Sequence, residues 1–399
     1  MQKPTSPFTR EQLLPKEERL EISKEKGALF IGIPKEMSFQ EKRVCLTPDA
    51  VSALTNNGHR VMIESGAGDN AFFNDHEYSE AGAEIAMDRA KVFGCPIILK
   101  VEPPTIEEIE LLNPKSLLIS AIQMKMRHKD YFKKLSEKRI TALGFEFIKD
   151  PDGAFPAVRQ LSEIAGSASI LIASEIMSIT NQGNGLMLGN ISGVPPTEVV
   201  IIGAGTVGEY AARSAIGLGA NIRVFDNSIS KLRALQANLG RTIYTSTMQP
   251  KNLQKALMRC DVAIGAAKAE NRAPILVNES LVEQMKSGAV IVDVSIDMGG
   301  CFETSEVTSH DNPTFVKHDV IHYCVPNIPA RYARTSSVSI SNIFTPYLLK
   351  IAEDGGIENS LRFDKGLKNG LYFYHGILTN KSIAEWFDLD CSDANLLIF

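Results

Sequence analysis

Residues 199–212, VVIIGAGTVGEYAA, are the stretch that most constrains the fold of this chain. An apolar run typical of a buried strand leads directly into Gly203, Gly205 and Gly208, and a helical pattern follows. A GxGxxG spacing between a strand and a helix is typical of a dinucleotide-binding turn. We expect Gly203 to allow the tight turn, Gly205 to let the backbone approach a pyrophosphate, and Gly208 to let the helix pack closely on the strand.

The next apolar run, NIRVFD, ends in Asp226, about 20 residues further along. A carboxylate at this distance can accept hydrogen bonds from both ribose hydroxyls of NAD, and it would repel the 2′-phosphate of NADP. The sequence therefore predicts NAD as the cofactor, although Arg223 and Lys231 lie close enough in sequence to favour a phosphate. In the alternative interpretation, the glycines only end a strand and Asp226 only caps the following helix.

Short apolar runs alternate with amphipathic stretches twice along the chain, first from Leu29 and again from about Val199. This alternation predicts parallel βαβ units and two sheets. Two apolar segments of helical length, residues 162–177 and 339–355, flank the second series. We therefore predict an α/β protein with two Rossmann-like doubly wound domains, the first discontinuous and the NAD domain inserted into it. Three consecutive domains are the alternative.

The predicted substrate domain comprises residues 29–156 plus 349–399, and the predicted NAD-binding domain comprises residues 157–348. Residues 1–28 are polar and rich in charge, and we expect them to form a leader outside the fold.

Composition narrows the classes of partner. The net charge is -5 with acidic and basic residues mixed throughout, which argues against nucleic acid and favours a small molecule. No apolar run approaches the ~20 residues that a membrane helix needs, and no signal peptide is evident, so we expect a cytoplasmic protein. The six cysteines are scattered without a CxxC pair, and no cluster has metal-ligand spacing, so we predict no disulfide framework and no metal.

Several longer stretches resemble the alanine dehydrogenases and the related NAD-binding subunit of proton-pumping nicotinamide nucleotide transhydrogenase. The resemblance runs from about Phe30 to about Phe387. Its most specific motifs are IGIPKE, KRVCLTPDAV, SEIAG, QGNGLMLGNISGVPP, VVIIGAGTVG, VIVDVSIDMGGCFE, HYCVPNIPA and LTNKSIAEWF. The resemblance implies a discontinuous substrate domain around a central NAD domain, and a homo-oligomer, either a hexamer or a dimer.

The resemblance also implies roles for individual residues. Arg43 matches an arginine that grips the substrate carboxylate, for which a guanidinium offers two parallel donors; without the motif, Arg43 would more simply be a surface or cap residue. Asp297 matches the dehydrogenase aspartate near the nicotinamide and the substrate amine, where transhydrogenase subunits usually lack an acid. The implied cofactor contacts are Ser162, Gly203, Gly205, Thr206, Val207, Gly208, Asp226 and Asn342.

Two positions depart from the dehydrogenase pattern. The family motif KVKEP reads KVEPP here, so the catalytic lysine either becomes Glu102 or is lost, and Lys100 is the remaining candidate. The family histidine that exchanges protons with the substrate is replaced by Gln123, whose amide can hydrogen-bond a carbonyl but cannot carry a proton at neutral pH. His128, five residues further on, could substitute only if the loop differs from that of the family.

Together these features predict an NAD-dependent dehydrogenase that deaminates L-alanine or a related small amino acid to the 2-oxo acid. The candidate catalytic residues are Arg43, Lys100, Gln123 and Asp297. Two alternatives remain open: an NAD(H)-binding subunit of a transhydrogenase, which would need a membrane partner, and an NAD-binding regulatory protein that has lost catalysis.

Overall fold

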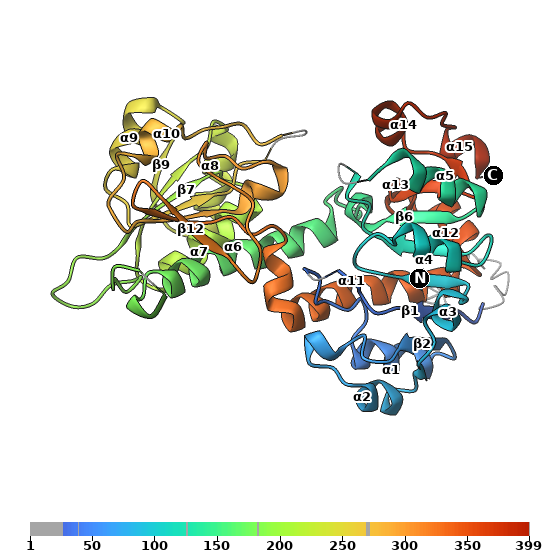
Figure 1. Ribbon diagram of the computed structural model, residues 1–399. Coiled ribbons are helices and arrows are strands. Elements are labelled where there is room, and N and C mark those ends of the chain that lie inside the picture. The colour runs from blue at the N-terminus through green and yellow to red at the C-terminus, as the bar shows by residue number, and fades with distance from the viewer. Residues whose placement is uncertain (1–26, 39, 125–126, 182, 269–271, 399) are drawn as a thin grey trace, which may run out of the picture.

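The computed structural model of the chain describes residues 27–38, 40–124, 127–181, 183–268 and 272–398. Two α/β lobes, each with one sheet at its centre, are joined by two long helices (Figure 1). The predicted leader, residues 1–28, lies outside the described residues except for its last two positions. None of the helices in the described ranges combines the length and the apolar character needed to cross a membrane.

The first lobe contains an eight-stranded sheet. Its strands are β1 (Phe30–Ile33), β2 (Arg60–Glu64), β3 (Glu84–Ala86), β4 (Ile97–Leu99), β5 (Leu117–Ser120), β6 (Thr141–Gly144), β14 (Leu371–Tyr374) and β15 (Ile377–Leu378), in the order β15-β14-β6-β5-β4-β1-β2-β3. The first six pair in parallel, whereas β14 pairs antiparallel with both β6 and β15. The chain therefore leaves this sheet after β6 and returns near its C-terminus to complete it.

The second lobe contains a seven-stranded sheet. Its strands are β7 (Glu198–Ile202), β8 (Asn221–Phe225), β9 (Tyr244–Ser246), β10 (Val262–Gly265), β11 (Val290–Asp293), β12 (Thr314–Lys317) and β13 (Val320–Tyr323). The order β9-β8-β7-β10-β11-β13 is the doubly wound order, and β12 adds an antiparallel edge. The direction of winding reverses between β7 and β10, and ligands of such sheets bind at the carboxyl ends of the strands at this point.

Helices cover both sheets. They are α1 (Pro48–Asn56), α2 (Asp75–Glu80), α3 (Arg89–Phe93), α4 (Ile106–Leu111), α5 (Lys129–Glu137), α6 (Pro156–Ile176), α7 (Thr206–Gly217), α8 (Ile229–Leu239), α9 (Pro250–Leu257), α10 (Glu279–Val282), α11 (Ala333–Glu353), α12 (Ile357–Phe363), α13 (Lys365–Asn369), α14 (Lys381–Phe387) and α15 (Ala394–Leu397).

The two helices that join the lobes are α6 and α11 (Figure 1). Ala168 and Ile172 of α6 are buried in a core of the second lobe, whereas Phe344 and Leu348 of α11 are buried in a core of the first. Both helices begin earlier than the apolar pattern predicted, α6 because Pro156 is suited to the first helical turn. The predicted fold class is confirmed, while the domain boundaries within the two helices stay a prediction.

Candidate active site

The glycine loop after β7 has the geometry of a phosphate cradle. Gly203 has φ +113°, and a Cβ there would lie 2.3 Å from the carbonyl oxygen of Ala266. A Cβ on Gly208 would lie 1.9 Å from the carbonyl oxygen of Gly203, so both positions exclude a side chain. Gly205 is the N-cap of α7, and a Cβ there would face open space. The loop thus leaves room for an anion beside the N-terminus of α7, whose free N–H groups attract negative charge.

Asp226 follows β8 and stabilises the glycine loop. Its Oδ2 accepts a hydrogen bond from Ala204 N (2.8 Å) and its Oδ1 accepts one from Ser228 N (2.7 Å). The carboxylate lines a cavity of about 190 Å³ together with Gly203 and Gly205. A carboxylate fixed in this way can still accept hydroxyl hydrogen bonds on its remaining lone pairs. The loop and this cavity fit the adenosine and pyrophosphate of NAD.

A larger cavity of about 410 Å³ lies next to the first, because Ala266, Ala267 and Lys268 line both. Residues from both lobes form its walls. The polar ones are Arg43, Gln123, Glu146, Ser162, Lys268, Ser295, Asp297 and Asn327. The two cavities together provide a path from the adenosine end of a dinucleotide to a chamber that contains the predicted substrate-binding arginine.

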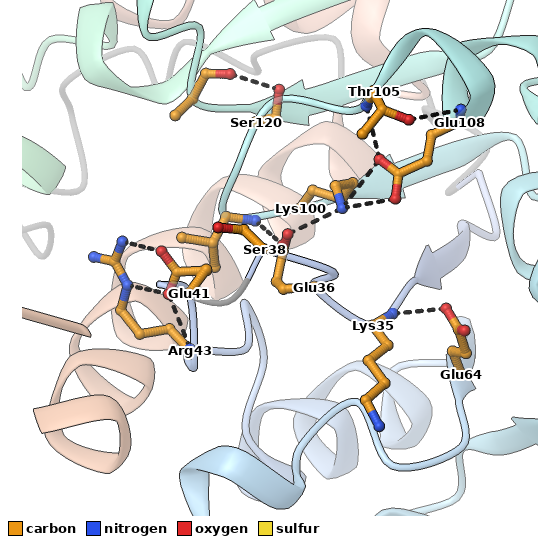
Figure 2. Close-up of polar contacts among 12 residues, drawn as sticks. Lys35, Glu36, Ser38, Glu41, Arg43, Glu64, Lys100, Thr105, Glu108 and Ser120 are labelled. Carbon is orange, nitrogen blue, oxygen red and sulfur yellow. Dashed lines mark hydrogen bonds and ion pairs between the residues drawn. The ribbon is translucent and has the colours of Figure 1, made fainter. Parts of the chain in front are cut away.

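Arg43 is buried and is held by one carboxylate. Its Nε and Nη2 donate to the two oxygens of Glu41 (2.7 and 2.5 Å), and its backbone N–H also donates to Glu41 (2.9 Å) (Figure 2). Burial alone would raise the pKa of Glu41, but the Arg43 guanidinium more than offsets burial and holds that pKa below its usual value. The remaining guanidinium nitrogen, Nη1, is buried and has no hydrogen-bond partner among the described residues. It is the donor left over for a ligand.

Asp297 lies in a 3₁₀ helix, η5 (Val294–Met298), directly after β11. Its Oδ1 accepts a hydrogen bond from Asn327 N (2.9 Å), and Asn327 Nδ2 donates to Glu41 Oε2 (3.0 Å). Burial raises the pKa of Asp297, although the Asn327 N–H and the Arg43 guanidinium favour the charged form. Asn327 therefore joins the acid of the second lobe to the ion pair of the first.

The turn that carries Asp297 is fixed by a second, fully buried carboxylate. Asp293, the last residue of β11, accepts hydrogen bonds from Ser295 N (3.0 Å), Cys301 N (2.9 Å) and Ser305 Oγ (2.7 Å). Because each of these donors lies in the segment that follows the strand, Asp293 closes the segment into one compact loop. The position of Asp297 thus depends on Asp293.

Gln123 also lines the cavity, at the carboxyl end of β5. Its backbone has φ +46°, an uncommon conformation for a residue other than glycine. The N–H groups of Ile122 and Gln123 both donate to Glu146 Oε1 (2.7 and 3.2 Å), which holds the strained turn in place. Glu146, like Glu41, Asp293 and Asn327, was not identified from the sequence. Glu146 and Asn327 act through partners more than 20 residues away in the chain. Glu41 and Asp293 have nearby partners, Arg43 for the first and residues 295–305 for the second, but their motifs did not indicate these contacts.

The structure does not bring Lys100 into the cavity. Its buried Nζ lies 2.9 Å from Glu36 Oε2 and 3.4 Å from the carboxylate of Glu108 (Figure 2). Glu102, one of the two outcomes predicted for the family lysine, is hydrogen-bonded to Ser38, and its pKa is raised by burial and then by the nearby Glu41 carboxylate. The predicted catalytic residue Lys100 therefore lies in an ion-pair network behind the cavity wall.

The remaining predicted residues divide into two groups. Ser162 of α6 and Val207 of α7 line the cavity, and Thr206 begins α7 beside the glycine loop. Asn342 lies exposed on α11 and is absent from the linings of both cavities. His128 is the exposed N-cap of α5 and likewise lines neither of them. Within the described part of the chain, no group of three or more His, Cys, Asp or Glu side chains is arranged to hold a metal ion.

Comparison with protein families gives two matches that together span most of the chain. Residues 32–165 match the family described as alanine dehydrogenase/PNT, N-terminal domain, and residues 169–381 match its C-terminal domain. Alanine dehydrogenase 2 of Staphylococcus aureus (strain USA300) is 37% identical over 362 residues, which cover 90% of this chain and 97% of that protein.

Two solved structures are similar over most of their length. An L-alanine dehydrogenase superposes with a TM-score of 0.85 and 34% identity, covering 90% of this chain and 99% of the other. A transhydrogenase from Sinorhizobium meliloti superposes with a TM-score of 0.76 over 88% of this chain and 99% of the other. At 21% identity, the second similarity supports the fold alone.

Proposed function

The chain belongs to the alanine dehydrogenase/PNT family as an NAD-dependent oxidoreductase acting on an amino-acid CH–NH₂ group, and from this premise we propose its substrate and the roles of its residues. The proposed reaction is the oxidative deamination of L-alanine or a similarly small amino acid to the 2-oxo acid. One observation carries this proposal: the glycine-loop cavity adjoins a chamber that contains the free donor of Arg43 and the carboxyl of Asp297.

In the proposed complex, Gly203, Gly205, Gly208 and Asp226 hold NAD, with Thr206 and Val207 at the start of α7 and Ser162 on the facing helix. NAD, when bound, supplies a hydride acceptor for Cα of the amino acid. The chain itself has to hold the substrate, stabilise the charge that develops on nitrogen, and move protons.

Arg43 is proposed to bind the substrate carboxylate through Nη1. Glu41 occupies Nε and one N–H of Nη2, so the N–H groups of Nη1 are the donors left to form charge-assisted hydrogen bonds to the substrate carboxylate from a rigidly placed group. Binding in one orientation lowers the activation barrier, because the substrate loses its translational and rotational entropy on binding and not in the chemical step.

Asp297 is proposed to face the substrate nitrogen. As hydride leaves Cα, the amine becomes an iminium, and a nearby carboxylate stabilises the new positive charge. Asn327 N donates to Oδ1 of Asp297, and the hydrogen bonds among the described residues leave the second oxygen of Asp297 available for the substrate. Gln123 is proposed to hydrogen-bond the oxo group, whereas Lys100 is proposed to support the wall through Glu36 and Glu108.

An assay panel tests the proposed activity. Purified protein is mixed with NAD⁺ and single amino acids, and separately with NADH, ammonium and single 2-oxo acids, while absorbance at the reduced-cofactor band is followed. Reversible turnover with alanine and pyruvate, or with a close homologue of either, is the expected result. NADH binding without turnover on any substrate would contradict the proposal and favour a binding protein. Hydride exchange that requires NADPH and a membrane fraction would favour a transhydrogenase subunit.

A homo-oligomer is also proposed. Residues 183–194 project from the second lobe (Figure 1), and they expose Met187, Ile191 and Val194; Ile179 is exposed just before them in the chain. Large apolar side chains exposed on a projecting segment are suited to burial against a second copy of the chain. Sedimentation velocity on the full chain should give a mass that is a multiple of 43.7 kDa, and a monomer at micromolar concentration would contradict this assignment.

A further inference from the structure

We propose that Glu146 is a catalytic residue of the deamination, the group that carries a proton between water and the substrate nitrogen. This inference rests on the proposed function. It answers a need that the site leaves open, because Gln123 cannot carry a proton at neutral pH and His128 is exposed outside the cavity.

The first observation is the asymmetric bonding of the carboxyl group. Glu146 lies in a 3₁₀ turn, η3 (Phe145–Phe147), directly after β6. Its Oε1 accepts both hydrogen bonds, from Ile122 N and Gln123 N, whereas Oε2 is buried without a hydrogen-bond partner among the described residues. An unpartnered buried carboxylate oxygen is costly. That cost falls when the carboxylate is protonated, because protonation removes its negative charge. A residue that carries a proton is in this protonated state after it has accepted the proton and before it has donated it.

The second observation is the distribution of titratable groups over the two walls. Four charged or titratable side chains line the cavity within the described residues: Arg43 and Glu146 from the first lobe, and Lys268 and Asp297 from the second, which carries the glycine loop. A guanidinium stays protonated and cannot exchange a proton. Among the described residues of the first lobe that line the cavity, Glu146 is therefore the charged side chain that can gain and lose a proton.

The surroundings of Glu146 suit this task. Burial raises its pKa above the ordinary value for glutamate, and the two backbone N–H groups offset part of that rise. The Glu146 carboxyl acts electrostatically on two phenols, Tyr131 of α5 and Tyr372 of β14, whose hydroxyls lie 3.4 Å apart. Both phenols stay neutral at physiological pH because burial raises their pKa values further. A carboxyl that titrates closer to neutral pH is a better general acid and base.

The proton balance assigns one step to Glu146. After hydride has left Cα and the amine has lost a proton, water adds to the iminium carbon, and the carboxylate of Glu146 takes one proton from that water. Glu146 returns this proton to the amine nitrogen of the resulting carbinolamine. The C–N bond then breaks with both electrons moving to nitrogen, which releases ammonia. The hydroxyl proton is transferred to this ammonia as the C=O bond forms, so the products are the 2-oxo acid and ammonium.

Glu146→Gln separates proton transfer from structure. The amide oxygen of Gln can still accept from Ile122 N and Gln123 N, so the turn is retained while titration is lost. We expect kcat for deamination to fall about 100-fold or more, the pH-rate limb of the wild type to disappear, and the NADH dissociation constant and the melting temperature to match the wild type. Glu110→Gln, at an exposed helix position that lines neither cavity, is the control and should leave all four quantities unchanged.

A second variant tests the assignment by rescue. Adding Gln123→His to Glu146→Gln should restore part of kcat and introduce a new limb near the imidazole pKa of about 6.5. An active wild type with the same kcat and pH profile as Glu146→Gln would overturn the role of Glu146 alone. A wild type without NAD-dependent turnover on any amino acid would overturn the proposed function, and the role of Glu146 with it.

Discussion

At the scale of single residues, the site depends on the guanidinium of Arg43, part of whose hydrogen-bonding capacity is taken by Glu41. Glu41 takes Nε and one N–H of Nη2 of Arg43, and Nη1 has no hydrogen-bond partner within the described part of the chain. The sequence predicted Arg43 and Asp297 because each lies in a recognisable motif. Glu41, Asn327 and Glu146 could not be assigned roles in the same way, because their partners are set by contacts between segments up to 286 residues apart.

Arg43→Lys should raise KM for the amino acid by about 10-fold to 100-fold, because an ammonium cannot satisfy Glu41 and a substrate carboxylate in the same geometry. The dissociation constant of NADH should not change, since Arg43 lies in the first lobe and the glycine loop in the second. Steady-state kinetics and NADH fluorescence titration measure the two quantities. An unchanged KM would contradict the assignment of Arg43 as the carboxylate anchor.

At the scale of elements, the strand–glycine loop–helix unit is where sequence and structure agree most closely. The spacing of its glycines is a local signal that a sequence reports directly, although the clash that excludes a side chain at Gly203 comes from Ala266, 63 residues further along. The short strands β14 and β15 were not predicted, because two to four residues carry too little periodicity, and tertiary pairing with β6 decides their conformation. The conformation of Gln123 could not be predicted from the sequence either, because its positive φ is held by Glu146, 23 residues away, and not by its neighbours in the chain.

Two glycine substitutions should separate folding from binding. A methyl group at Gly208 would meet the backbone oxygen of Gly203 at 1.9 Å, so Gly208→Ala should lower the melting temperature of the protein by several degrees or prevent folding. A methyl group at Gly205 meets no protein atom within 4 Å, so Gly205→Ala should fold normally and bind NADH at least 10-fold more weakly. Differential scanning calorimetry and NADH titration measure both effects. Tight NADH binding by Gly205→Ala would be inconsistent with a pyrophosphate at this position.

At the scale of the whole molecule, the candidate active site forms only where the two lobes meet, because residues of both lobes line its cavity. Hydrophobic patterning along the chain predicted two sheets and a returning C-terminal segment, because each sheet has its own strand–helix alternation. It could not predict that Asn327 would link Asp297 to Glu41, since this contact depends on how α6 and α11 orient the lobes. The same limit explains why Lys100, on a recognisable motif, turns away to Glu36 and Glu108.

Stability of the second lobe should decline in mild acid. His322 is fully buried, with its ring nitrogens hydrogen-bonded to Thr304 Oγ1 (2.8 Å) and Val320 O (3.0 Å), and burial lowers its pKa to about 4. Between pH 6.5 and about 4 the unfolded chain binds a proton that the folded chain does not, so stability present above pH 6.5 is lost as the pH falls. The melting temperature of the wild type should therefore fall across this window.

The matched variant is His322→Gln, which cannot titrate and retains a hydrogen-bonding side chain, so its melting temperature should depend less on pH. His128→Gln, at an exposed position, is the control. Parallel melting curves for the wild type and His322→Gln from pH 7 to pH 4.5 would show that His322 does not govern this transition.

The most direct test of the central claim follows the hydrogen atom on Cα. L-Alanine deuterated at Cα is incubated with the full chain and NAD⁺, and the reduced cofactor and the 2-oxo acid are examined by mass spectrometry. We expect each reduced cofactor molecule to carry one deuterium and to form in equal amount with pyruvate and ammonium, at a rate that Arg43→Lys lowers when alanine is subsaturating. Reduced cofactor without deuterium, or no reduction with alanine or any similarly small amino acid, would contradict the assignment of this protein as an amino-acid dehydrogenase.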